Sequence, residues 1–389
     1  MTAARRGGAR LAAARALLDW METGRRPAVP RDCPAESRQF VQDLLYTSVK
    51  RGRAARAALG PFVSKWPGGI AGALLETGAV QLLYMPEIPA FAAVDETVEA
   101  AKLAGRNVPA GLVNAVLRNL ERNKAAAAER LAAEPLHVRE SHPRRLVERW
   151  TEDFGAEAAE KIAKFDNTPG ETWLLHRDGR REKLERGRAV ESLPGYAQGD
   201  FIVQDPSQAD AVGMFDFARA PELLDLCAAP GGKTIQAAFA GARVTACEIN
   251  PGRRKTLEEN IERTKTGKDV AILCEPPPGA LFRNILVDAP CSNTGVMRKR
   301  PDARWNWSER KTAQLAALQA ELLDKAAAFA APGATLVYST CSIDPRENRE
   351  QAEAFLSRHG DFALVRESAK LPHADGCDGS YAAAMEKRQ

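Results

Sequence analysis

Apolar residues recur every three to four positions over the first 124 residues of the chain. The pattern predicts amphipathic helices over 9–21, 35–52, 70–85, 91–105 and 109–123, with Pro and Gly residues between them. A polar helical connector follows and leads to Pro143. We therefore expect an all-helical domain over residues 1–130.

The pattern becomes mixed between residues 140 and 205. Stretches 144–155 and 156–167 have the spacing of short helices, and 171–179, 187–196 and 200–205 have that of short strands. The sequence predicts a small α+β module over 140–205.

From residue 206 onward, strands alternate with helices. The predicted strands are 222–230, 243–250, 269–275, 283–290 and 334–342, and the predicted helices are 232–241, 253–265, 308–330 and 345–360. This alternation is typical of a mainly parallel sheet with helices on both faces. Ligands bind such sheets beyond the carboxyl ends of the strands. We expect one α/β domain over 206–389.

Composition places the chain among globular proteins without membrane spans. A length of 389 residues indicates two or three domains, and the formal net charge is only +4. No apolar run is long enough to cross a bilayer, and the N-terminus lacks a secretory pattern. The seven cysteines form no CxxC pair, so we predict no zinc site, reduced thiols and a cytoplasmic protein. We also expect a monomer.

Basic residues crowd the first sixty positions. They are Arg5, Arg6, Arg10, Arg15, Arg25, Arg26, Arg31, Arg38, Lys50, Arg51, Arg53 and Arg56. A solvated helical surface and a surface that faces phosphates both explain them, and the sequence does not separate the two.

The segment 223–234 (LLDLCAAPGGKT) combines a strand end, a Gly-Gly turn and a helix start. Its spacing is neither GxGxxG nor GxxxxGK[ST], which excludes a dinucleotide fingerprint and a P-loop. An acid, Glu248, ends the next predicted strand. A Gly-rich loop followed by a carboxylate suits a nucleoside whose ribose needs hydrogen bonds, whereas the Gly-Gly pair alone would fit a structural turn.

Two cysteines, Cys291 and Cys341, lie in polar loops just past predicted strands. They should therefore share one cleft with the Gly-rich loop. Buried and inert thiols are the commoner case, and Cys247 and Cys274 fit it, as does Cys227. A Cys/His protease is disfavoured because none of the five histidines follows a predicted strand end.

Stretch 295–307 (GVMRKRPDARWNW) places basic residues around two tryptophans. The basic residues are Arg298, Lys299, Arg300 and Arg304, and the tryptophans are Trp305 and Trp307. Such a mixture suits contacts with a nucleic-acid backbone and stacking of exposed bases, which we favour over a solvated loop with core tryptophans.

Three motifs together resemble the Sun-type (Fmu) RNA cytosine-5 methyltransferases. They are DLCAAPGGKT (225–234), DAPCSNTGVMRKRPDARW (288–305) and LVYSTCSIDPRENRE (336–350). QDPSQ (204–208) is similar to the family motif that precedes the catalytic domain. The helical stretches 74–102 and 111–120 resemble the NusB-like RNA-binding domain of the bacterial small-subunit rRNA enzyme, and 371–387 resembles its final hairpin.

The resemblance implies a Rossmann-like domain with a seven-stranded sheet that binds S-adenosylmethionine and methylates small-subunit ribosomal RNA. It assigns Cys341 to a covalent bond with carbon 6 of cytosine, which makes carbon 5 nucleophilic, and Cys291 to release after methylation. Asp288 and Lys233 would contact cofactor and base. The residues that it assigns to the cofactor are Cys227, Ala228, Ala229, Pro230, Gly231, Gly232, Lys233, Glu248, Glu275 and Asp288.

Several positions depart from the family pattern. Glu275 stands in a short, Pro-rich stretch where an Asp near the adenine is usual, and Phe282-Arg283-Asn284 replaces Phe-Asp before the fourth strand. Asn293 replaces a small residue beside Cys291. Two other functions therefore stay open: a non-catalytic RNA-binding assembly factor, and a cytosine-5 methyltransferase for transfer RNA or DNA.

Overall fold

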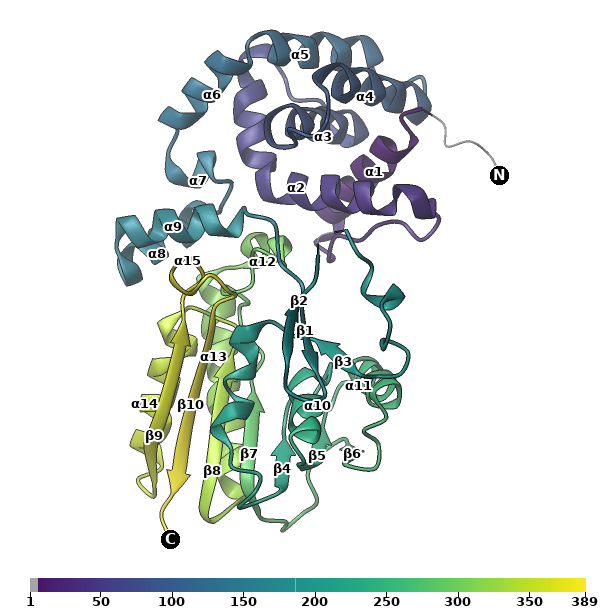
Figure 1. Cartoon of the computed structure of the whole chain (residues 1–389). Coiled ribbons are helices and arrows are strands. Elements are labelled where there is room, and N and C mark those ends of the chain that lie inside the picture. The colour runs from purple at the N-terminus through teal and green to yellow at the C-terminus, as the bar shows by residue number, and fades with distance from the viewer. Residues whose placement is uncertain (1–5, 186) are drawn as a thin grey trace. The chain divides into compact units, whose positions relative to one another are not determined.

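The computed structural model describes residues 6–185 and 187–389, which divide into two compact units (Figure 1). The first holds the chain up to Thr168 together with Arg304–Asn306, and the second holds Pro169–Ala303 and Trp307–Gln389. The helices predicted at 144–167 belong to the first unit, and the strands of the predicted small module belong to the second. The division into three domains stays a prediction. No helix in the described ranges combines the length and apolarity that a membrane span requires.

The described residues of the first unit form helices and the turns and loops between them, as predicted for residues 1–130. Its helices are α1 (Gly8–Thr23), α2 (Ala35–Leu59), α3 (Gly69–Tyr84), α4 (Ala90–Ala104), α5 (Ala110–Arg122), α6 (Lys124–Ala133), α7 (Leu136–Arg139), α8 (Arg144–Phe154) and α9 (Ala156–Asp166), with a 3₁₀ turn η1 (Gly60–Phe62). Helix α3 is buried on nearly every side and packs against α1, α2, α4 and α5. An all-round apolar helix needs such a central position because it has no face to give to water.

Several of the N-terminal arginines hold this unit together. Arg51 pairs with Glu140 at 2.8 Å and Arg56 with Glu76 at 2.5 Å, while Arg53 donates to the carbonyl of His142. These contacts join α2 to α3 and to the segment after α7. Arg51 and Arg53 are partly buried partners within the fold, which neither alternative drawn from the sequence describes, whereas Arg56 pairs with Glu76 and remains 43% exposed.

Arg304 corrects the interpretation of the basic and aromatic stretch. Its side chain is fully buried in the first unit and donates to Asn167 Oδ1 at 2.9 Å and to the carbonyl of Asp166 at 3.1 Å. Burial lowers its pKa to about 10. The indole of Trp305 donates to the carbonyl of Val49, and Trp307 is buried in the second unit. Because these side chains are buried or hydrogen-bonded within the protein, the prediction that they stack on exposed bases is wrong for them.

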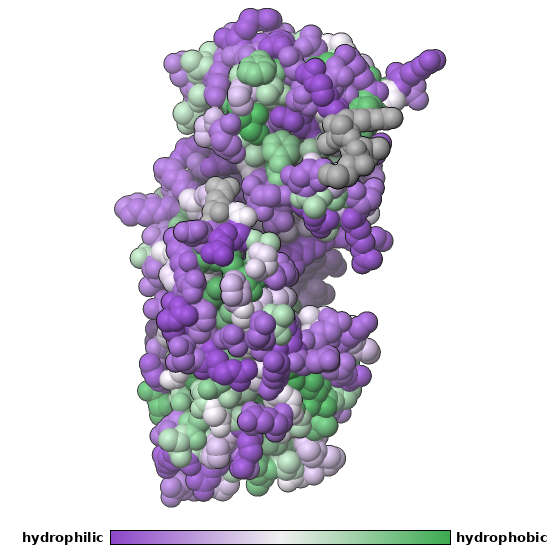
Figure 2. All heavy atoms as spheres, turned by 45° about the vertical axis from the view of Figure 1, so that its right-hand side comes forward, coloured by the Kyte–Doolittle hydropathy of each residue, from purple (hydrophilic) through white to green (hydrophobic). Residues whose placement is uncertain are grey.

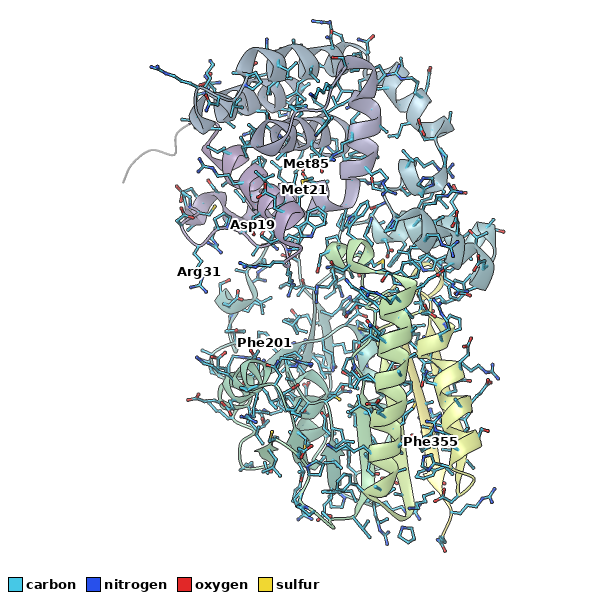
Figure 3. All side chains as sticks on the ribbon, turned by 180° about the vertical axis from the view of Figure 1, so that it is seen from behind. Asp19, Met21, Arg31, Met85, Phe201 and Phe355 are labelled. Carbon is cyan, nitrogen blue, oxygen red and sulfur yellow. The ribbon has the colours of Figure 1, made fainter. Side chains whose placement is uncertain are left out.

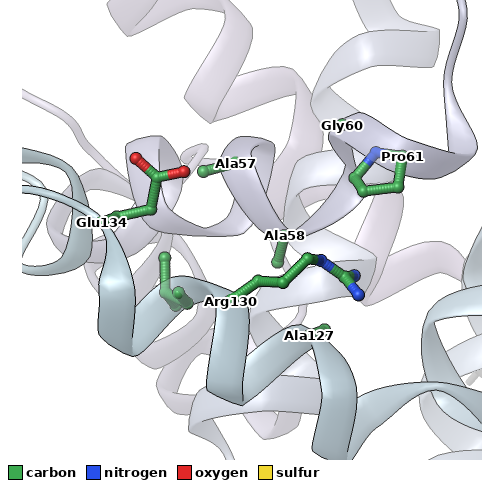
Figure 4. Close-up of a pocket in the computed structure, with 8 residues that line it drawn as sticks. Ala57, Ala58, Gly60, Pro61, Ala127, Arg130 and Glu134 are labelled. Atoms are coloured by element: carbon green, nitrogen blue, oxygen red, sulfur yellow. The ribbon is translucent and has the colours of Figure 1, made fainter.

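The first unit contains a cavity of about 300 Å³ between α2, η1 and α6 (Figure 4). Three alanines contribute to its lining, and Arg130 and Glu134 supply its charged side chains. None of the motifs named above lies in its lining.

The second unit begins with a small antiparallel sheet of order β2-β1-β3, formed by β1 (Trp173–His176), β2 (Arg181–Lys183) and β3 (Phe201–Val203). The strand predicted at 187–196 is wrong, because the described residues there form turns and a 3₁₀ turn, η2 (Val190–Ser192). Strand β2 was not predicted, since its three residues are all charged and exposed and show no apolar alternation.

The main sheet has seven strands, as the resemblance implied. They are β4 (Glu222–Asp225), β5 (Arg243–Cys247), β6 (Val270–Leu273), β7 (Phe282–Asp288), β8 (Ala330–Thr340), β9 (Phe362–Lys370) and β10 (Ser380–Lys387), in the order β6-β5-β4-β7-β8-β10-β9. Strand β10 runs antiparallel to both neighbours, whereas strands β4 to β8 pair in parallel. The carboxyl ends of those five strands therefore meet at one edge of the sheet.

Helices cover both faces of this sheet. Apolar residues of α10 (Gly232–Phe239) and α11 (Pro251–Thr264) pack on one face, and those of α13 (Glu309–Ala328) and α14 (Arg349–Arg358) pack on the other. On α14, Phe355 contacts Phe362 of β9 with ring centroids 5.1 Å apart (Figure 3). The short helices are α12 (Pro301–Asn306) and α15 (Pro372–Asp375), and the 3₁₀ turns are η3 (Pro206–Ala209), η4 (Val212–Met214) and η5 (Pro345–Glu347).

The surface seen in Figure 2 is mostly hydrophilic, with scattered apolar residues. The exposed large apolar side chains of the chain include Phe91, Ile249, Leu281 and Val365, which lie on separate elements. Single exposed apolar residues are normal for a globular protein.

Gly78 tests the packing of the central helix. A Cβ at this position of α3 would lie 2.5 Å from Leu117 Cδ1 of α5, so Gly78→Ala should destabilise the protein by about 1–3 kcal/mol. Gly111→Ala is the control, because nothing lies within 4 Å of its Cβ position and alanine favours helix by roughly 0.5 kcal/mol or more. Thermal unfolding should show a lower Tm for the first variant and an unchanged or higher Tm for the second. Equal Tm values would contradict the tight contact between the helices.

Candidate active site

The Gly-rich loop after β4 is held by buried hydrogen bonds. Asp225, the last residue of β4, accepts from the Thr234 hydroxyl at 2.7 Å and from the Cys227 backbone N–H at 3.3 Å. Burial raises the pKa of Asp225 to about 6. Gly231 has φ 109°, a conformation that favours glycine, and helix α10 begins directly after it.

Helix α11 anchors the same loop from the other side. Arg253 donates to the carbonyl of Ala229 at 2.6 Å, and Asn260 donates to that of Pro230 at 2.9 Å. The N–H of Ala228 donates to the carbonyl of Cys247. The backbone of the loop is therefore fixed before any ligand arrives. Cys227 is largely buried, which raises the pKa of its thiol.

Glu248 follows β5, as predicted, and its side chain is almost buried. One carboxylate oxygen accepts from the backbone N–H of Asn250 at 2.9 Å, and the other lies 3.4 Å from Nε of Arg253. The next residue, Ile249, is 71% exposed. A carboxylate can accept hydrogen bonds from the hydroxyls of a ribose, and an exposed apolar side chain beside it can pack against the attached base. The sequence interpretation did not include Ile249, because an isolated isoleucine next to a strand carries no distinctive pattern.

Lys233 and Asp288 lie together at the same edge. The Lys233 ammonium is 2.8 Å from Asp288 Oδ2 and donates to Gln208 Oε1 at 2.9 Å. The other oxygen of Asp288 accepts from the Ser339 hydroxyl at 2.7 Å. The motifs at 204–208, 225–234, 288–305 and 336–350 thus contribute side chains to one cluster of the second unit. Ser339 was not identified from the sequence, because its contact with Asp288 depends on how β7 and β8 are paired in the sheet.

The two predicted cysteines also meet. The sulfur atoms of Cys291, after β7, and Cys341, after β8, are 3.2 Å apart. Cys291 is buried and Cys341 is partly exposed. The hydrogen bond with Cys341, followed by burial, holds the pKa of the Cys291 thiol well above its ordinary value. Asn293 Oδ1 lies 3.2 Å from Cys341 Sγ as its hydrogen-bond acceptor.

The remaining cysteines are only partly as predicted. Cys247 is buried, and burial raises its pKa to about 12, which fits an inert thiol. Cys274 lies beyond the end of β6 and is exposed, so the prediction that it is buried is wrong.

Glu275 does not share the hydrogen bonds of this cluster. Its carboxylate is 60% exposed and pairs with Lys325 of α13 at 2.7 Å. The side chain therefore binds a helix that covers one face of the sheet.

The basic residues next to Cys291 have partners inside the second unit. Lys299 lies 2.5 Å from Asp205 and 2.9 Å from Asp378, and Arg298 is buried. Burial raises the pKa of Asp378 to about 6. This network connects the segment before the main sheet to the final hairpin, so Lys299 and Arg298 stabilise the edge that carries the cysteines.

Comparison with known proteins agrees with both parts of the chain. The family described as 16S rRNA methyltransferase RsmB/F matches residues 214–386, and the NusB family matches residues 8–122. A protein named Ribosomal RNA small subunit methyltransferase B from Serratia proteamaculans is 36% identical, with 81% of each chain covered. The protein of the same name from Erwinia tasmaniensis is 33% identical, with 93% of each chain covered.

Solved structures support the fold. The structure titled Crystal Structure of PH0851 covers 97% of this chain and 99% of its own, with a TM-score of 0.73 and 20% identity. The structure of NSun6 from Pyrococcus horikoshii with SFG covers 64% of this chain and 98% of its own, with a TM-score of 0.54 and 17% identity. At these identities the likeness is one of fold.

A mainly parallel sheet with a Gly-rich first loop and an acid after the second strand is the architecture of a nucleotide-binding α/β domain, and together with the family matches it makes this an α/β methyltransferase with a NusB-type helical region before it. The chain belongs to the RsmB/F family of 16S rRNA methyltransferases.

The raised pKa of Asp225 leads to a prediction about stability. The folded protein holds this proton up to about pH 6, whereas the unfolded chain releases it near 3.8, so unfolding becomes easier as pH rises from about 4 to 6. Asp225→Asn removes this effect and should raise the Tm relative to that of the natural protein. The Tm difference should grow between about pH 4 and 6 and stay the same at higher pH. The gain is at most about 3 kcal/mol.

Asp216→Asn is the control, since Asp216 is exposed and its backbone contacts can be kept by an amide oxygen. Its Tm should follow that of the natural protein at every pH. A Tm difference for Asp225→Asn that does not change between pH 4 and 7 would refute the proposed origin.

Proposed function

We propose that this protein transfers a methyl group from S-adenosylmethionine to carbon 5 of a cytosine in small-subunit ribosomal RNA. The observation that carries the proposal is the 3.2 Å approach of the Cys291 and Cys341 sulfurs at the sheet edge that also holds Lys233 and Asp288. Relatives named Ribosomal RNA small subunit methyltransferase B support the substrate class. We propose further that the protein acts as a cytoplasmic monomer.

The residues at this edge fit S-adenosylmethionine. Glu248 follows β5 and Asp288 ends β7, and their carboxylates suit a cofactor with a sulfonium and an ammonium group. The buried Asp225 at the end of β4 holds the Gly-rich loop from inside. Glu248 suits the ribose hydroxyls, and the exposed Ile249 suits the adenine. The fixed loop from Cys227 to Lys233 holds the methionine part. When bound, the cofactor supplies the methyl group.

The two cysteines have different roles: Cys341 forms the covalent bond to the base, and Cys291 assists its release. Carbon 5 of cytosine is too weak a nucleophile to accept a methyl group, and addition of the Cys341 thiolate to carbon 6 places electron density on carbon 5. After methylation, removal of the carbon 5 proton breaks the bond between carbon 6 and sulfur. We assign this release to Cys291, whose sulfur lies 3.2 Å from that of Cys341. As a thiolate it takes the carbon 5 proton, the electron pair of that C–H bond forms the double bond between carbons 5 and 6, and the Cys341 sulfur leaves carbon 6 as a thiolate. Lys233 and Asp288 orient the base.

The target cytosine must leave its stack to reach a thiol at this edge. The NusB-type region, residues 8–122, is proposed to bind the RNA around it. We propose the residues 1–130, 140–205 and 206–389 as functional divisions, with the small module contributing to RNA affinity.

The assignment of the cysteines predicts opposite outcomes for two variants. Cys341→Ala should abolish both product and adduct, whereas Cys291→Ala should accumulate a protein–RNA adduct that survives denaturing electrophoresis. Cys274→Ala, at an exposed thiol outside the cluster, is the control and should methylate normally. Methylation by Cys341→Ala would disprove the assignment. Bisulfite sequencing of total RNA from cells without the protein would identify the cytosine and separate ribosomal from transfer RNA.

Cofactor binding separates an enzyme from a non-catalytic assembly factor. Calorimetry should detect S-adenosylmethionine binding, and Glu248→Gln should weaken it by about tenfold to a hundredfold, because a charged hydrogen bond contributes about 1.5–3 kcal/mol. Glu258→Gln, on the exposed side of α11, is the matched control. No binding by the natural protein would favour the assembly factor.

A further inference from the structure

Glu347 is a fully buried carboxylate beside the two cysteine loops. It ends the 3₁₀ turn η5, six residues after Cys341 in the chain. None of the residue roles assigned above involves Glu347.

The carboxylate is surrounded by donors from both loops. One oxygen accepts from the Ser292 backbone N–H at 2.8 Å and from Gln319 Nε2 at 3.2 Å. The other accepts from the hydroxyls of Ser292 and Ser342, the latter at 2.7 Å. Ser292 directly follows Cys291, and Ser342 directly follows Cys341. A single side chain therefore binds the residue next to each sulfur.

Neighbouring groups complete the connection. Gln319 of α13 also donates to the carbonyl of Pro290 at 2.8 Å, so Cys291 is held on both sides. Asn348 accepts from the Thr340 hydroxyl at 2.6 Å and donates to the carbonyl of Ser342 at 2.9 Å, which holds Cys341 on both sides. The loop after β7 and the loop after β8 thus share one network of buried hydrogen bonds.

The chemistry of the site explains why such a centre is needed. Both sulfurs must reach the same pyrimidine ring, one at carbon 6 and one near the proton on carbon 5. They lie on separate loops, so contacts between the loops are needed to fix the distance between the sulfurs. A misplacement of about 1 Å can cost about a hundredfold in rate. Burying a carboxylate is unfavourable unless donors satisfy it, and here the donors are the loops themselves.

We propose that Glu347 is a positioning residue that holds Cys291 and Cys341 at the separation needed to act on one cytosine. The inference rests on the proposed function for its biological meaning, but the geometric claim is independent of it. Removing the carboxylate takes away the acceptor that the Ser292 N–H and both hydroxyls share, while Thr294 still contacts Ser342 at 2.8 Å. The two loops are then held less tightly, without any change in the cysteines.

The rate of disulfide formation between the two cysteines depends on their separation and on the fraction of thiolate, so it is compared among the variants over a range of pH that includes values where both thiols are ionised. With diamide, one thiolate adds to the N=N bond and the second displaces the resulting group, so that the thiols are oxidised and diamide is reduced to a hydrazine. Mass spectrometry identifies the linked 291 and 341 peptides. Glu347→Ala should slow this coupling about tenfold or more, and Glu347→Gln, which keeps the shape and one acceptor oxygen, should slow it less. Glu350→Ala is the control, since Glu350 lies nearby on α14 and is exposed.

Turnover supplies the second readout. Glu347→Ala should lower kcat about tenfold or more, with KM for RNA and the affinity for S-adenosylmethionine within about twofold of the natural protein. Coupling and kcat at natural levels in Glu347→Ala would overturn the proposal. If that variant does not fold, Ser342→Ala, which removes one donor and keeps the carboxylate, carries the same test with a smaller expected loss. A natural protein that couples its cysteines quickly but never methylates RNA would refute the proposed function and leave the positioning role of Glu347 standing.

Discussion

The parallel pairing of β7 with β8 is the constraint on which the site depends. In this register Asp288 of β7 lies opposite Ser339 of β8, so the loops that follow the two strands leave the sheet next to each other. The loops that follow carry Cys291 and Cys341, and a shared strand edge is what allows two residues fifty positions apart to bring their sulfurs within 3.2 Å. A slip of one residue in this pairing would turn the side chains of one strand to the opposite face and separate the sulfurs.

Electrostatics at the same edge follow from the order of the strands. Strands β5, β4 and β7 are neighbours, and an acid ends or follows each of them. Lys233 neutralises one of these carboxylates through its ion pair with Asp288. Burial raises the pKa of another, Asp225, to about 6. The edge is therefore rich in carboxylates, and the buried Asp225 lowers the stability of the fold at neutral pH.

The elements of this fold could largely be predicted from local patterns, and the contacts of the site only in part. Strong periodicity located the helices of the first unit, and strand ends located Glu248, Asp288 and both cysteines. The short charged strand β2 and the burial of Arg304 could not be predicted, because each depends on partners distant in the sequence. Glu347 was also missed. An acid within a polar loop looks like any solvated residue until the loops of β7 and β8 are placed around it.

Asn293 shows how the site accommodates a departure from the family pattern. Its φ is 60°, a conformation in which glycine is at ease and asparagine is among the more tolerant side chains. The side chain then adds contacts that a small residue lacks, since Nδ2 donates to the carbonyl of Cys291 at 3.0 Å and Oδ1 accepts from Cys341. The substitution therefore connects the two cysteine loops on the side of the sulfurs, while Glu347 connects them through the serines. Because both links act on the same pair of loops, the departure reinforces the geometry that methyl transfer to cytosine requires.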